Sequence, residues 1–347
     1  MLAYVFHVKH NEVLHTNVSR ETRSRIHEHD VSRETRNVRQ ISMFHVKRSN
    51  KRGLDLKRAE VSHETSPRLE QRTYKIEREE DVGFRDEAKS KEAKDLRVIA
   101  IINQKGGVGK STTTVNLAAA LGKHGKKVLV VDFDPQGNTT SGFGIEKEKL
   151  THCIYDALLR DYPAEELVME TNDEHVFVIP ATIQLAGAEI ELVSTMARET
   201  RLKDLLEPIE NEFEFVLIDC PPSLGLLTIN SLAAADSVLI PIQCEYYALE
   251  GVTKLLESMR MVKGRINKNL DIFGVLLTMY DSRTSLANQV ADEVRNYFGE
   301  KTFKTCIPRS VKVSESPSYG MPVVDYAPLN KAAHAYMKLS EEVIERA

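Results

Sequence analysis

Eight consecutive residues combine the groups that hold the phosphates of a nucleotide. They read Lys105-Gly106-Gly107-Val108-Gly109-Lys110-Ser111-Thr112. Glycines allow the backbone to turn its N–H groups inward around phosphate oxygens, while a lysine adds positive charge and a hydroxyl can ligate Mg²⁺. We predict that Lys110 reaches the β- and γ-phosphates of ATP, that Ser111 ligates Mg²⁺ and that Thr112 contacts the α-phosphate.

Three aspartates could supply the remaining chemistry of nucleotide hydrolysis. Asp219 ends an apolar run at residues 215–218, and Asp132 and Asp134 follow another at residues 128–131. The carboxyl ends of strands face the ligand crevice in open α/β sheets. We predict that Asp219 holds Mg²⁺ through water, that Asp134 polarises the attacking water, and that Asp132 has a structural role or lies behind the Mg²⁺ ligands. An aspartate that only caps a helix is the alternative for Asp132 or Asp134.

Apolar strands alternate with Ala- and Leu-rich helices after residue 95. We expect strands at residues 97–103, 127–132, 176–180, 215–219, 237–241 and 272–278. Most of the segments between them are long enough for helices, which is typical of a mostly parallel sheet covered by helices on both faces. The phosphate loop follows the first strand and precedes a helix expected from Thr113, as such a loop requires. The predicted fold class is therefore α/β, a P-loop NTPase.

Composition excludes several other classes of protein. Hydrophobic residues make up 41% and charged residues 28% of the chain, as in ordinary soluble proteins, and no apolar run approaches a bilayer span. The first ten residues lack a signal-peptide pattern, so we expect a cytoplasmic protein with no membrane partner. The four cysteines form no CxxC pair, which favours neither disulfides nor zinc. A net charge of -4 means that any DNA contact must be a local patch.

The first 95 residues differ from the rest of the chain. They contain seven of the eleven histidines among many Arg, Glu and Ser residues, with no sustained helical or strand period. This composition is typical of disorder. We therefore predict a disordered extension at residues 1–95 and an ATPase domain at residues 96–347.

Two short peptides recur in this extension. Phe-His-Val-Lys begins at Phe6 and Phe44, and Val-Ser-Arg-Glu-Thr begins at Val18 and Val31, with Val-Ser-His-Glu-Thr at Val61. The bases GTTTCACGTGAAACA encode the second peptide, and the same bases read one position later encode the first. Their core, GTTTCACGTGAAAC, equals its own reverse complement, as a site read by a symmetric dimer would. We hypothesise that residues 1–95 are translated DNA-binding sites upstream of a mis-assigned start.

A genuine peptide repeat that docks a partner is the alternative for this region. The nucleotide sequence decides, because unrelated codons in the five copies would exclude a common DNA element. If the element is real, the native start lies downstream. It would then use a non-ATG codon, for instance at Val82 or Leu96, because no methionine occurs between Met43 and Met169.

Several motifs in this order resemble the ParA/Soj family of chromosome- and plasmid-partitioning ATPases. A lysine at the start of the loop, here Lys105, distinguishes the deviant Walker A group to which that family belongs. The resemblance covers residues 97–340 and includes Asp134-Pro135-Gln136-Gly137-Asn138, Ile218-Asp219-Cys220-Pro221-Pro222, Gln243-Cys244-Glu245-Tyr246-Tyr247-Ala248-Leu249-Glu250-Gly251, Ile307-Pro308-Arg309 and Glu315-Ser316-Pro317.

The resemblance implies an ATP-driven cycle. ATP-bound subunits form a sandwich homodimer in which Lys105 acts on the partner's phosphates. The dimer binds double-stranded DNA without sequence preference on the nucleoid, and a ParB-type partner stimulates hydrolysis and release. By position, Pro308 and Ser310 correspond to residues that line the adenine, and Arg283 and Lys312 to residues that contact DNA. ParB binds a palindromic site called parS, which resembles the back-translated element.

Three alternatives use the same phosphate loop. A MinD-like cell-division ATPase requires a basic amphipathic C-terminal helix, whereas residues 340–347 here are acidic. A nitrogenase-reductase-like electron carrier requires cysteines that bridge an iron–sulfur cluster between subunits, and Cys220 and Cys244 are not in the matching context. A DNA-binding regulator that uses ATP only as a switch, with little turnover, stays open. ATPase measurements with DNA and ParB would separate it from a partition ATPase.

Overall fold

The computed structural model describes residues 96–246 and 249–347. One eight-stranded sheet runs through this part of the chain. The strand order is β3-β4-β2-β5-β1-β6-β7-β8. All neighbours are parallel except β3 and β4, which pair antiparallel. The strands are β1 (Arg97–Ile101), β2 (Val128–Asp132), β3 (Met169–Glu170), β4 (Val176–Ile179), β5 (Phe215–Asp219), β6 (Ser237–Gln243), β7 (Asp271–Tyr280) and β8 (Thr302–Pro308).

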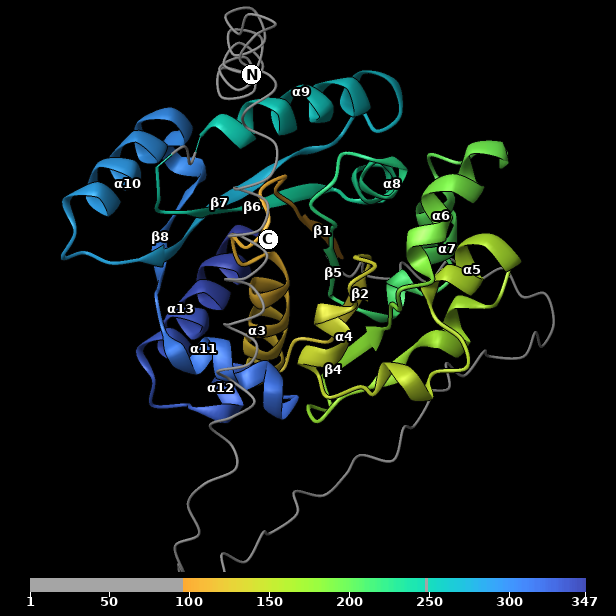
Figure 1. The fold of residues 1–347 in the computed structure, drawn as a ribbon, viewed down its shortest axis with the longest axis horizontal. Coiled ribbons are helices and arrows are strands. Elements are labelled where there is room, and N and C mark those ends of the chain that lie inside the picture. Colours follow the sequence, from red (N-terminus) through yellow and green to blue (C-terminus); the bar gives the residue numbers. More distant parts are fainter. Residues whose placement is uncertain (1–95, 247–248) are drawn as a thin grey trace, which may run out of the picture. The chain divides into compact units, whose positions relative to one another are not determined.

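Helices connect the strands and cover the sheet (Figure 1). They are α3 (Lys110–Lys123), α4 (Asn138–Gly142), α5 (Ile154–Arg160), α6 (Leu185–Glu191), α7 (Arg201–Leu206), α8 (Leu226–Ala234), α9 (Glu250–Arg265), α10 (Ser285–Phe298), α11 (Val311–Glu315), α12 (Val323–Tyr326) and α13 (Lys331–Arg346). The short 3-10 helix η7 (Ser316–Tyr319) joins α11 to the segment before α12.

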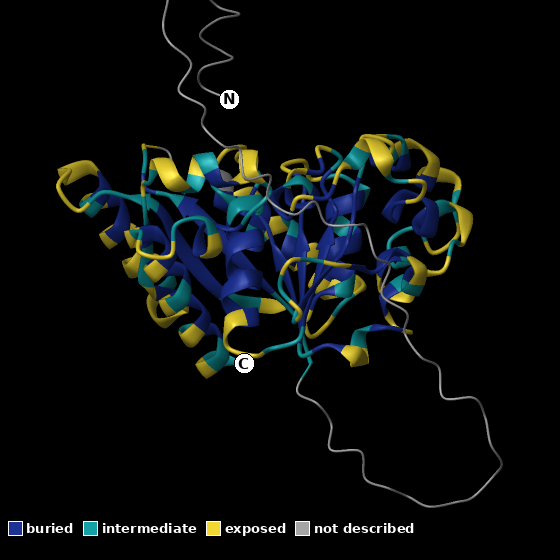
Figure 2. Cartoon of the chain, turned by 90° about the horizontal axis from the view of Figure 1, so that it is seen from below, coloured by how far each residue is buried: buried dark blue, intermediate teal, exposed yellow. Residues whose placement is uncertain are grey.

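Alternate residues of each central strand enter two separate cores. Val98 and Ala100 of β1 pack in one core with residues of α5 to α10, whereas Ile99 and Ile101 pack in the other with α3, α12 and α13. Helices cover both faces of a parallel sheet, so its central strands are buried on both sides and need a continuous apolar run. Figure 2 shows the buried strands in the centre of the domain and the exposed outer faces of the helices. The predicted α/β architecture with helices on both faces is confirmed.

All six predicted strands are present, but two others were missed. Strand β3 has two residues, too few to produce a pattern. Strand β8 lies at the opposite edge of the sheet, and its exposed Lys304 and intermediate Thr305 and Cys306 interrupt the apolar pattern of a buried strand. Its pairing with β7, which ends at Tyr280 opposite Pro308, is decided by tertiary packing.

Candidate nucleotide site

The phosphate loop spans the connection between β1 and α3, as predicted. Gly107 and Gly109 have backbone φ angles of 75° and 92°, a region that side chains with a Cβ atom disfavour. No atom lies within 4 Å of a Cβ added at Gly107, so this glycine is required by its backbone conformation and not by lack of space. Gly109 caps α3 and accepts a hydrogen bond from Thr113 N at 2.8 Å. The N-terminus of α3 therefore points its free N–H groups at the loop, where they favour an anion.

Distant strands hold the two sides of this loop. The Thr278 hydroxyl, at the carboxyl end of β7, donates to the Val108 carbonyl at 2.8 Å. Asn103 donates from Nδ2 to the Pro241 carbonyl at 2.7 Å and accepts from Lys105 N at 3.0 Å. The loop is thus tied to both β6 and β7 before any nucleotide binds. Sequence reasoning did not identify Thr278, which has no motif of its own.

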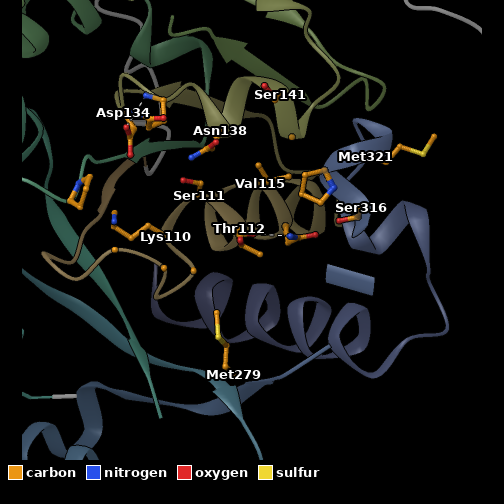
Figure 3. Close-up of a pocket in the computed structure, with 18 residues that line it drawn as sticks. Lys110, Ser111, Thr112, Val115, Asp134, Asn138, Ser141, Met279, Ser316 and Met321 are labelled. Carbon is orange, nitrogen blue, oxygen red and sulfur yellow. Dashed lines mark hydrogen bonds between the residues drawn. The ribbon is translucent and has the colours of Figure 1, made fainter. Parts of the chain in front are cut away.

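A cavity of about 460 Å³ opens in front of the loop. Figure 3 shows Lys110, Ser111 and Asp134 at one end of this cavity and Ser316 and Met321 at the other. Lys110 is 6% exposed and lines the cavity, which places its charge where the loop's N–H groups converge. The remaining lining residues are Gly106, Gly107, Gly109, Thr112, Val115, Asn116, Gln136, Asn138, Ser141, Gly142, Pro222, Met279 and Pro317.

Asp132 and Asp219 face each other in register at the ends of β2 and β5. Two adjacent threonines of α4 hold them: the Thr140 hydroxyl and backbone N donate to Asp132 Oδ2 at 2.6 and 2.7 Å, and the Thr139 hydroxyl donates to Asp219 Oδ2 at 2.7 Å. Burial raises the pKa of Asp132 to about 8, and the charge of Asp219 contributes to that rise. Burial also raises the pKa of Asp219 to about 6, against the effect of the Ser111 and Thr139 hydroxyls.

The free oxygen of Asp219 fits a magnesium site. Asp219 Oδ1 is buried and has no hydrogen-bond partner among the described residues. A buried carboxylate oxygen without a donor is costly unless a cation or a cation-bound water occupies its lone pairs. The Ser111 hydroxyl lies near this carboxylate and lines the cavity. Mg²⁺ takes one or two protein oxygens together with phosphate oxygens and waters, so Asp219 and Ser111 are a suitable pair.

The hydrogen bonds of Asp132 all organise the polypeptide itself. Its Oδ1 accepts from Asp134 N at 3.3 Å, and its Oδ2 accepts the two bonds from Thr140. The Thr140 hydroxyl also accepts from Ala181 N at 3.0 Å, which joins the turn after β2 to the segment after β4. These contacts favour the structural role over the magnesium role that we predicted for Asp132.

Asp134 lies in a tight turn that aims its side chain at the cavity. It is 6% exposed, and its Oδ1 accepts from Gln136 N at 2.9 Å. Gly137 follows with a φ of 61°, and a Cβ there would come within 2.7 Å of the Ala181 carbonyl oxygen. The sequence Asp-Pro-Gln-Gly therefore has a steric reason: only glycine allows this close approach. Asp134 Oδ2 accepts no hydrogen bond from the described residues, which leaves it available to orient a water.

Lys105 differs from Lys110 in its surroundings. Its side chain is exposed, it does not line the cavity, and it has no ion-pair partner within residues 96–246 and 249–347. A flexible, unpaired lysine beside a phosphate site is free to reach a group outside its own subunit.

The two residues expected at the adenine lie outside the cavity lining. Pro308 ends β8, and the Ser310 hydroxyl hydrogen-bonds to Asn330 Oδ1 at 3.1 Å. Their contact with adenine stays a prediction. At the end of the cavity away from Lys110 lie Ser316 and Met321, whereas Met279 lies apart from them (Figure 3).

Met279 is the least expected residue of the cavity lining. Its φ is 50°, a left-handed conformation that is uncommon for a residue with a long side chain. Such strain occurs where surrounding structure requires it, often at binding sites. The sequence motif around Ser316 and Pro317 could have indicated their proximity to the nucleotide, whereas nothing in the sequence marks Met279 or Met321.

Both residues expected at DNA are exposed and paired within the chain. Arg283 donates from Nε and Nη2 to the Asp281 carboxylate at 2.9 and 2.7 Å, which lowers the pKa of Asp281 to about 2. Lys312 Nζ lies 2.8 Å from Glu315 Oε2 and 5.4 Å from the centre of the Tyr326 ring. Exposed pairs of this kind are weak, so phosphates can compete for both cations.

The predictions for residues 1–95 lie outside the described residues. That holds for the disordered extension, the recurring peptides and the translated DNA element alike. Within the described part, the four cysteines are free, as expected. No helix there combines the length and apolar character needed to cross a bilayer.

Comparison with known proteins places the chain in a family. A family model described as AAA domain matches residues 96–272. The sporulation initiation inhibitor protein Soj of Bacillus subtilis (strain 168) is 56% identical over 247 residues, covering 71% of this chain and 98% of that protein. The chromosome partitioning protein ParA of Myxococcus xanthus is 51% identical over 250 residues, covering 72% and 88%. The chain belongs to the ParA/Soj family of partitioning ATPases.

Solved structures share this fold. Cobyrinic acid a,c-diamide synthase from Mycobacterium smegmatis with bound ATP analog and magnesium aligns with a TM-score of 0.64 at 37% identity, covering 72% of this chain and 95% of that one. The cell-division ATPase MinD of Pyrococcus furiosus aligns with a TM-score of 0.60 at 27% identity, covering 72% and 99%. The predicted family, the P-loop fold and the ATPase class are confirmed.

Proposed function

We propose that this chain is a DNA-segregation ATPase that binds ATP and Mg²⁺, dimerises, binds DNA without sequence preference on the nucleoid, and releases it after hydrolysis stimulated by a ParB-type partner. The observation that carries the proposal is the phosphate cavity, which Lys110, Ser111 and Asp134 line, in a chain 56% identical to Soj. The name of the Myxococcus xanthus relative describes chromosome partitioning, and the geometry supports the ATP-dependent part of that function.

The loop backbone and four side chains at or beside the cavity each have a task in hydrolysis. The loop N–H groups and Lys110 bind the phosphates and stabilise the negative charge that develops during phosphoryl transfer. Ser111 and Asp219 would hold Mg²⁺, which neutralises phosphate charge. Asp134, fixed by the turn at Gln136, orients the attacking water and accepts its proton.

The exposed Lys105 supports a dimeric active state. Within one subunit its side chain is exposed and does not line the cavity. Across a sandwich dimer it can add positive charge to the partner's phosphates, as an arginine finger does. We expect Lys105→Ala to bind ATP as a monomer and to hydrolyse it at a rate lowered about a thousandfold. Sedimentation in ATP, with Lys254→Ala as an exposed-lysine control on α9, measures the first effect.

DNA binding is expected to involve phosphates through Arg283 and Lys312. Phosphate contacts give affinity without sequence information, and each contact adds about one unit to the salt dependence of binding. We expect Arg283→Ala with Lys312→Ala to reduce the slope of log K against log salt by about two. A control pair, Lys254→Ala with Arg260→Ala, removes two exposed cations from α9 and leaves this slope unchanged.

Stimulated turnover tests the complete cycle. ATP hydrolysis is measured for the full chain alone, with duplex DNA, with a ParB-type protein, and with both. The proposal predicts synergistic stimulation when both are present. No stimulation under any condition would instead support the ATP-switched regulator with little turnover.

The C-terminal helix argues against the MinD-like alternative. Its apolar face is already buried: Ala333, Tyr336, Leu339 and Val343 of α13 pack in the same core as α3. A membrane-binding helix must keep its apolar face available for lipid. If anionic lipid vesicles retained the chain, the proposal that it has no membrane partner would be overturned.

A further inference from the structure

Thr139 holds one oxygen of the Asp219 carboxylate and leaves the other one available. The Thr139 hydroxyl donates to Asp219 Oδ2 at 2.7 Å, whereas Asp219 Oδ1 is buried and has no partner among the described residues. Both residues are completely buried. The two oxygens of a carboxylate share one plane, so a donor fixed on one oxygen also limits the direction of the other.

The backbone of Asp219 is fixed on both sides, which leaves only its side-chain torsions free. Its carbonyl oxygen accepts from Phe133 N at 3.0 Å, and the next residue, Cys220, donates from N to the Ile101 carbonyl at 3.2 Å. The end of β5 is thus tied to its two neighbours in the sheet, β2 and β1. The terminal torsion of an aspartate is broad, so a hydrogen bond to the carboxylate is needed to select one orientation.

The neighbouring threonine fixes the helix that carries Thr139. The Thr140 hydroxyl and backbone N donate to Asp132 Oδ2, and the same hydroxyl accepts from Ala181 N. Gly137, the N-cap of α4, also lies close to Ala181, because a Cβ there would come within 2.7 Å of the Ala181 carbonyl oxygen. The two threonines therefore have separate tasks: Thr140 attaches α4 to β2 and to the segment after β4, and Thr139 reaches β5.

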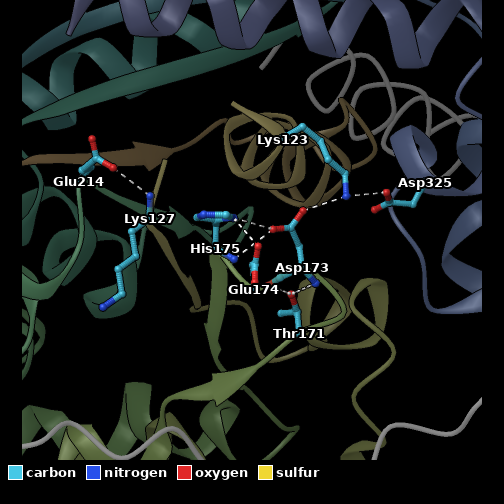
Figure 4. A network of polar contacts seen from close by, with 8 residues as sticks. All are labelled: Lys123, Lys127, Thr171, Asp173, Glu174, His175, Glu214 and Asp325. Atoms are coloured by element: carbon cyan, nitrogen blue, oxygen red, sulfur yellow. Dashed lines mark hydrogen bonds and ion pairs between the residues drawn. The ribbon is translucent and has the colours of Figure 1, made fainter. Parts of the chain in front are cut away.

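The other oxygen assigned to Mg²⁺, the Ser111 hydroxyl, belongs to a helix with supports of its own. Most residues of α3 are buried. Figure 4 shows Lys123, the last residue of α3, between Asp173 and Asp325, with both ion pairs at 2.9 Å. The Lys123 side chain is 41% exposed, so these pairs are weak and burial holds the helix. We therefore expect Ser111 to keep its place when a side chain of α4 is replaced.

We propose that Thr139 is a positioning residue for Mg²⁺: its hydrogen bond to Asp219 Oδ2 directs Asp219 Oδ1 at the cation or at a water bound to it. The inference rests on the proposed function, which assigns Mg²⁺ to Ser111 and Asp219. Groups behind metal ligands orient those ligands, and their loss typically weakens metal affinity about 10- to 100-fold. Thr139 does not line the nucleotide cavity, so its effect on the cation passes through Asp219.

The test compares nucleotide binding with and without Mg²⁺. The Kd of ADP, a ligand that is not consumed during the measurement, is determined by calorimetry for the full chain in EDTA and in saturating Mg²⁺. Thr139→Val removes the hydroxyl and keeps a side chain of similar shape. We expect its Kd to stay within about twofold of that of the unmodified chain in EDTA and to rise about tenfold in Mg²⁺.

A second measurement observes the cation directly. Mn²⁺ prefers the same oxygen ligands as Mg²⁺, and its free concentration can be followed by paramagnetic resonance. Because the coupling between two ligands is reciprocal, the affinity of the chain–ADP complex for Mn²⁺ should fall by the same factor in Thr139→Val.

Three further substitutions separate the bond to Asp219 from the packing of α4. Thr139→Ser keeps the hydroxyl and should bind ADP in Mg²⁺ within about twofold of the unmodified chain. Thr140→Val removes the adjacent hydroxyl, which bonds to Asp132, and should leave the ratio of the two Kd values unchanged although it lowers stability. Thr139→Ala places no methyl group against the carboxylate and should reproduce the loss seen in Thr139→Val.

Each outcome decides for or against one claim. An equal change of Kd in EDTA and in Mg²⁺, an unchanged affinity for Mn²⁺, or the same selective loss in Thr140→Val overturns the positioning role of Thr139. Failure of the unmodified chain to bind ADP in Mg²⁺ overturns the proposed function instead. A loss confined to Mg²⁺ in Thr139→Val and Thr139→Ala, with Thr139→Ser unaffected, establishes the role.

Discussion

The two ends of the nucleotide cavity are built in different ways. The phosphate end comes from one continuous loop and the adjacent turns after β2 and β5, with glycines and lysines in a fixed order. The other end comes from α3, α4 and the segment between α11 and α12, which meet only in the folded chain. The first end offers backbone N–H groups and charge, and the second offers Ser316, Pro317 and Met321. We expect ligands that carry only phosphates to report on the first end.

The largest effect is expected at the phosphate end. Lys110→Ala removes a buried charge that contacts the phosphates, and charged hydrogen bonds are the strong ones. We expect the affinities for ATP and for inorganic triphosphate to fall together, by about a hundredfold. Calorimetric titration of both ligands measures this, with Lys254→Ala as the control. Retained triphosphate binding would break the comparison between the two ends.

The next effect is a loss of ATP hydrolysis without a loss of ATP binding. Asp134→Asn keeps the oxygen that accepts from Gln136 N and removes the carboxylate charge. We expect turnover to fall about a thousandfold, whereas ATP affinity changes little. Sedimentation in the presence of ATP and DNA should then show an ATP-bound dimer that stays associated with the DNA. A variant that stays monomeric in ATP would contradict the role of Asp134.

A moderate effect is expected at the apolar end. Met321→Ala shortens one wall of the cavity and removes apolar area from its lining, and we expect ATP affinity to fall several-fold. The affinity for triphosphate should not change. Met261→Ala on α9 is the matched control, because Met261 is 65% exposed and does not line this cavity. If triphosphate affinity also fell, the two ends would not be separable.

The smallest effect is expected at the exposed ion pairs of Lys123. Burial lowers the pKa of Lys123, but its hydrogen bonds to Asp173 and Asp325 outweigh this and hold it above 10.5. Burial raises the pKa of Asp173, and Lys123 outweighs that and holds it below 3.8. We expect Asp325→Asn to lower the free energy of unfolding by less than about 1 kcal/mol at neutral pH.

The pH dependence of that contribution follows from the signs of the shifts. The lowered pKa of Asp173 gives stability that is complete above 3.8 and is lost as pH falls through the shifted value. The raised pKa of Lys123 gives stability that is complete below 10.5 and is lost as pH rises through the shifted value. Denaturant unfolding at several pH values, with and without 1 M salt, measures both limits. A salt-independent loss would indicate that Asp325 acts through packing.

Local chemistry made much of the site predictable. The loop at residues 105–112 could be predicted because its function requires φ angles that glycine adopts and charges that only certain side chains carry. The turn at Asp134 could be predicted for the same reason. Strands β1, β2 and β5 were predictable because burial on both faces of a parallel sheet demands continuous apolar runs.

Contacts between distant segments were not predictable from the sequence. Thr139 and Thr140 follow a recognised motif, but their attachment to Asp219 and Asp132 depends on the register of β2 against β5. Met279 and Met321 resemble ordinary core residues in sequence, and only the folded chain brings them to the cavity. The adenine contacts expected at Pro308 and Ser310 stay predictions for the same reason.

By itself, the sequence determined that this chain binds nucleotide phosphates, because a loop of consecutive residues carries the necessary backbone freedom and charge. The tertiary structure decided which segments form the other end of the cavity. Asn116 and Val323 are 207 residues apart, and their hydrogen bond exists only after α3 and the C-terminal segment pack on the same face of the sheet. Chemistry within a segment is encoded locally, whereas the width of a cavity is a property of packing.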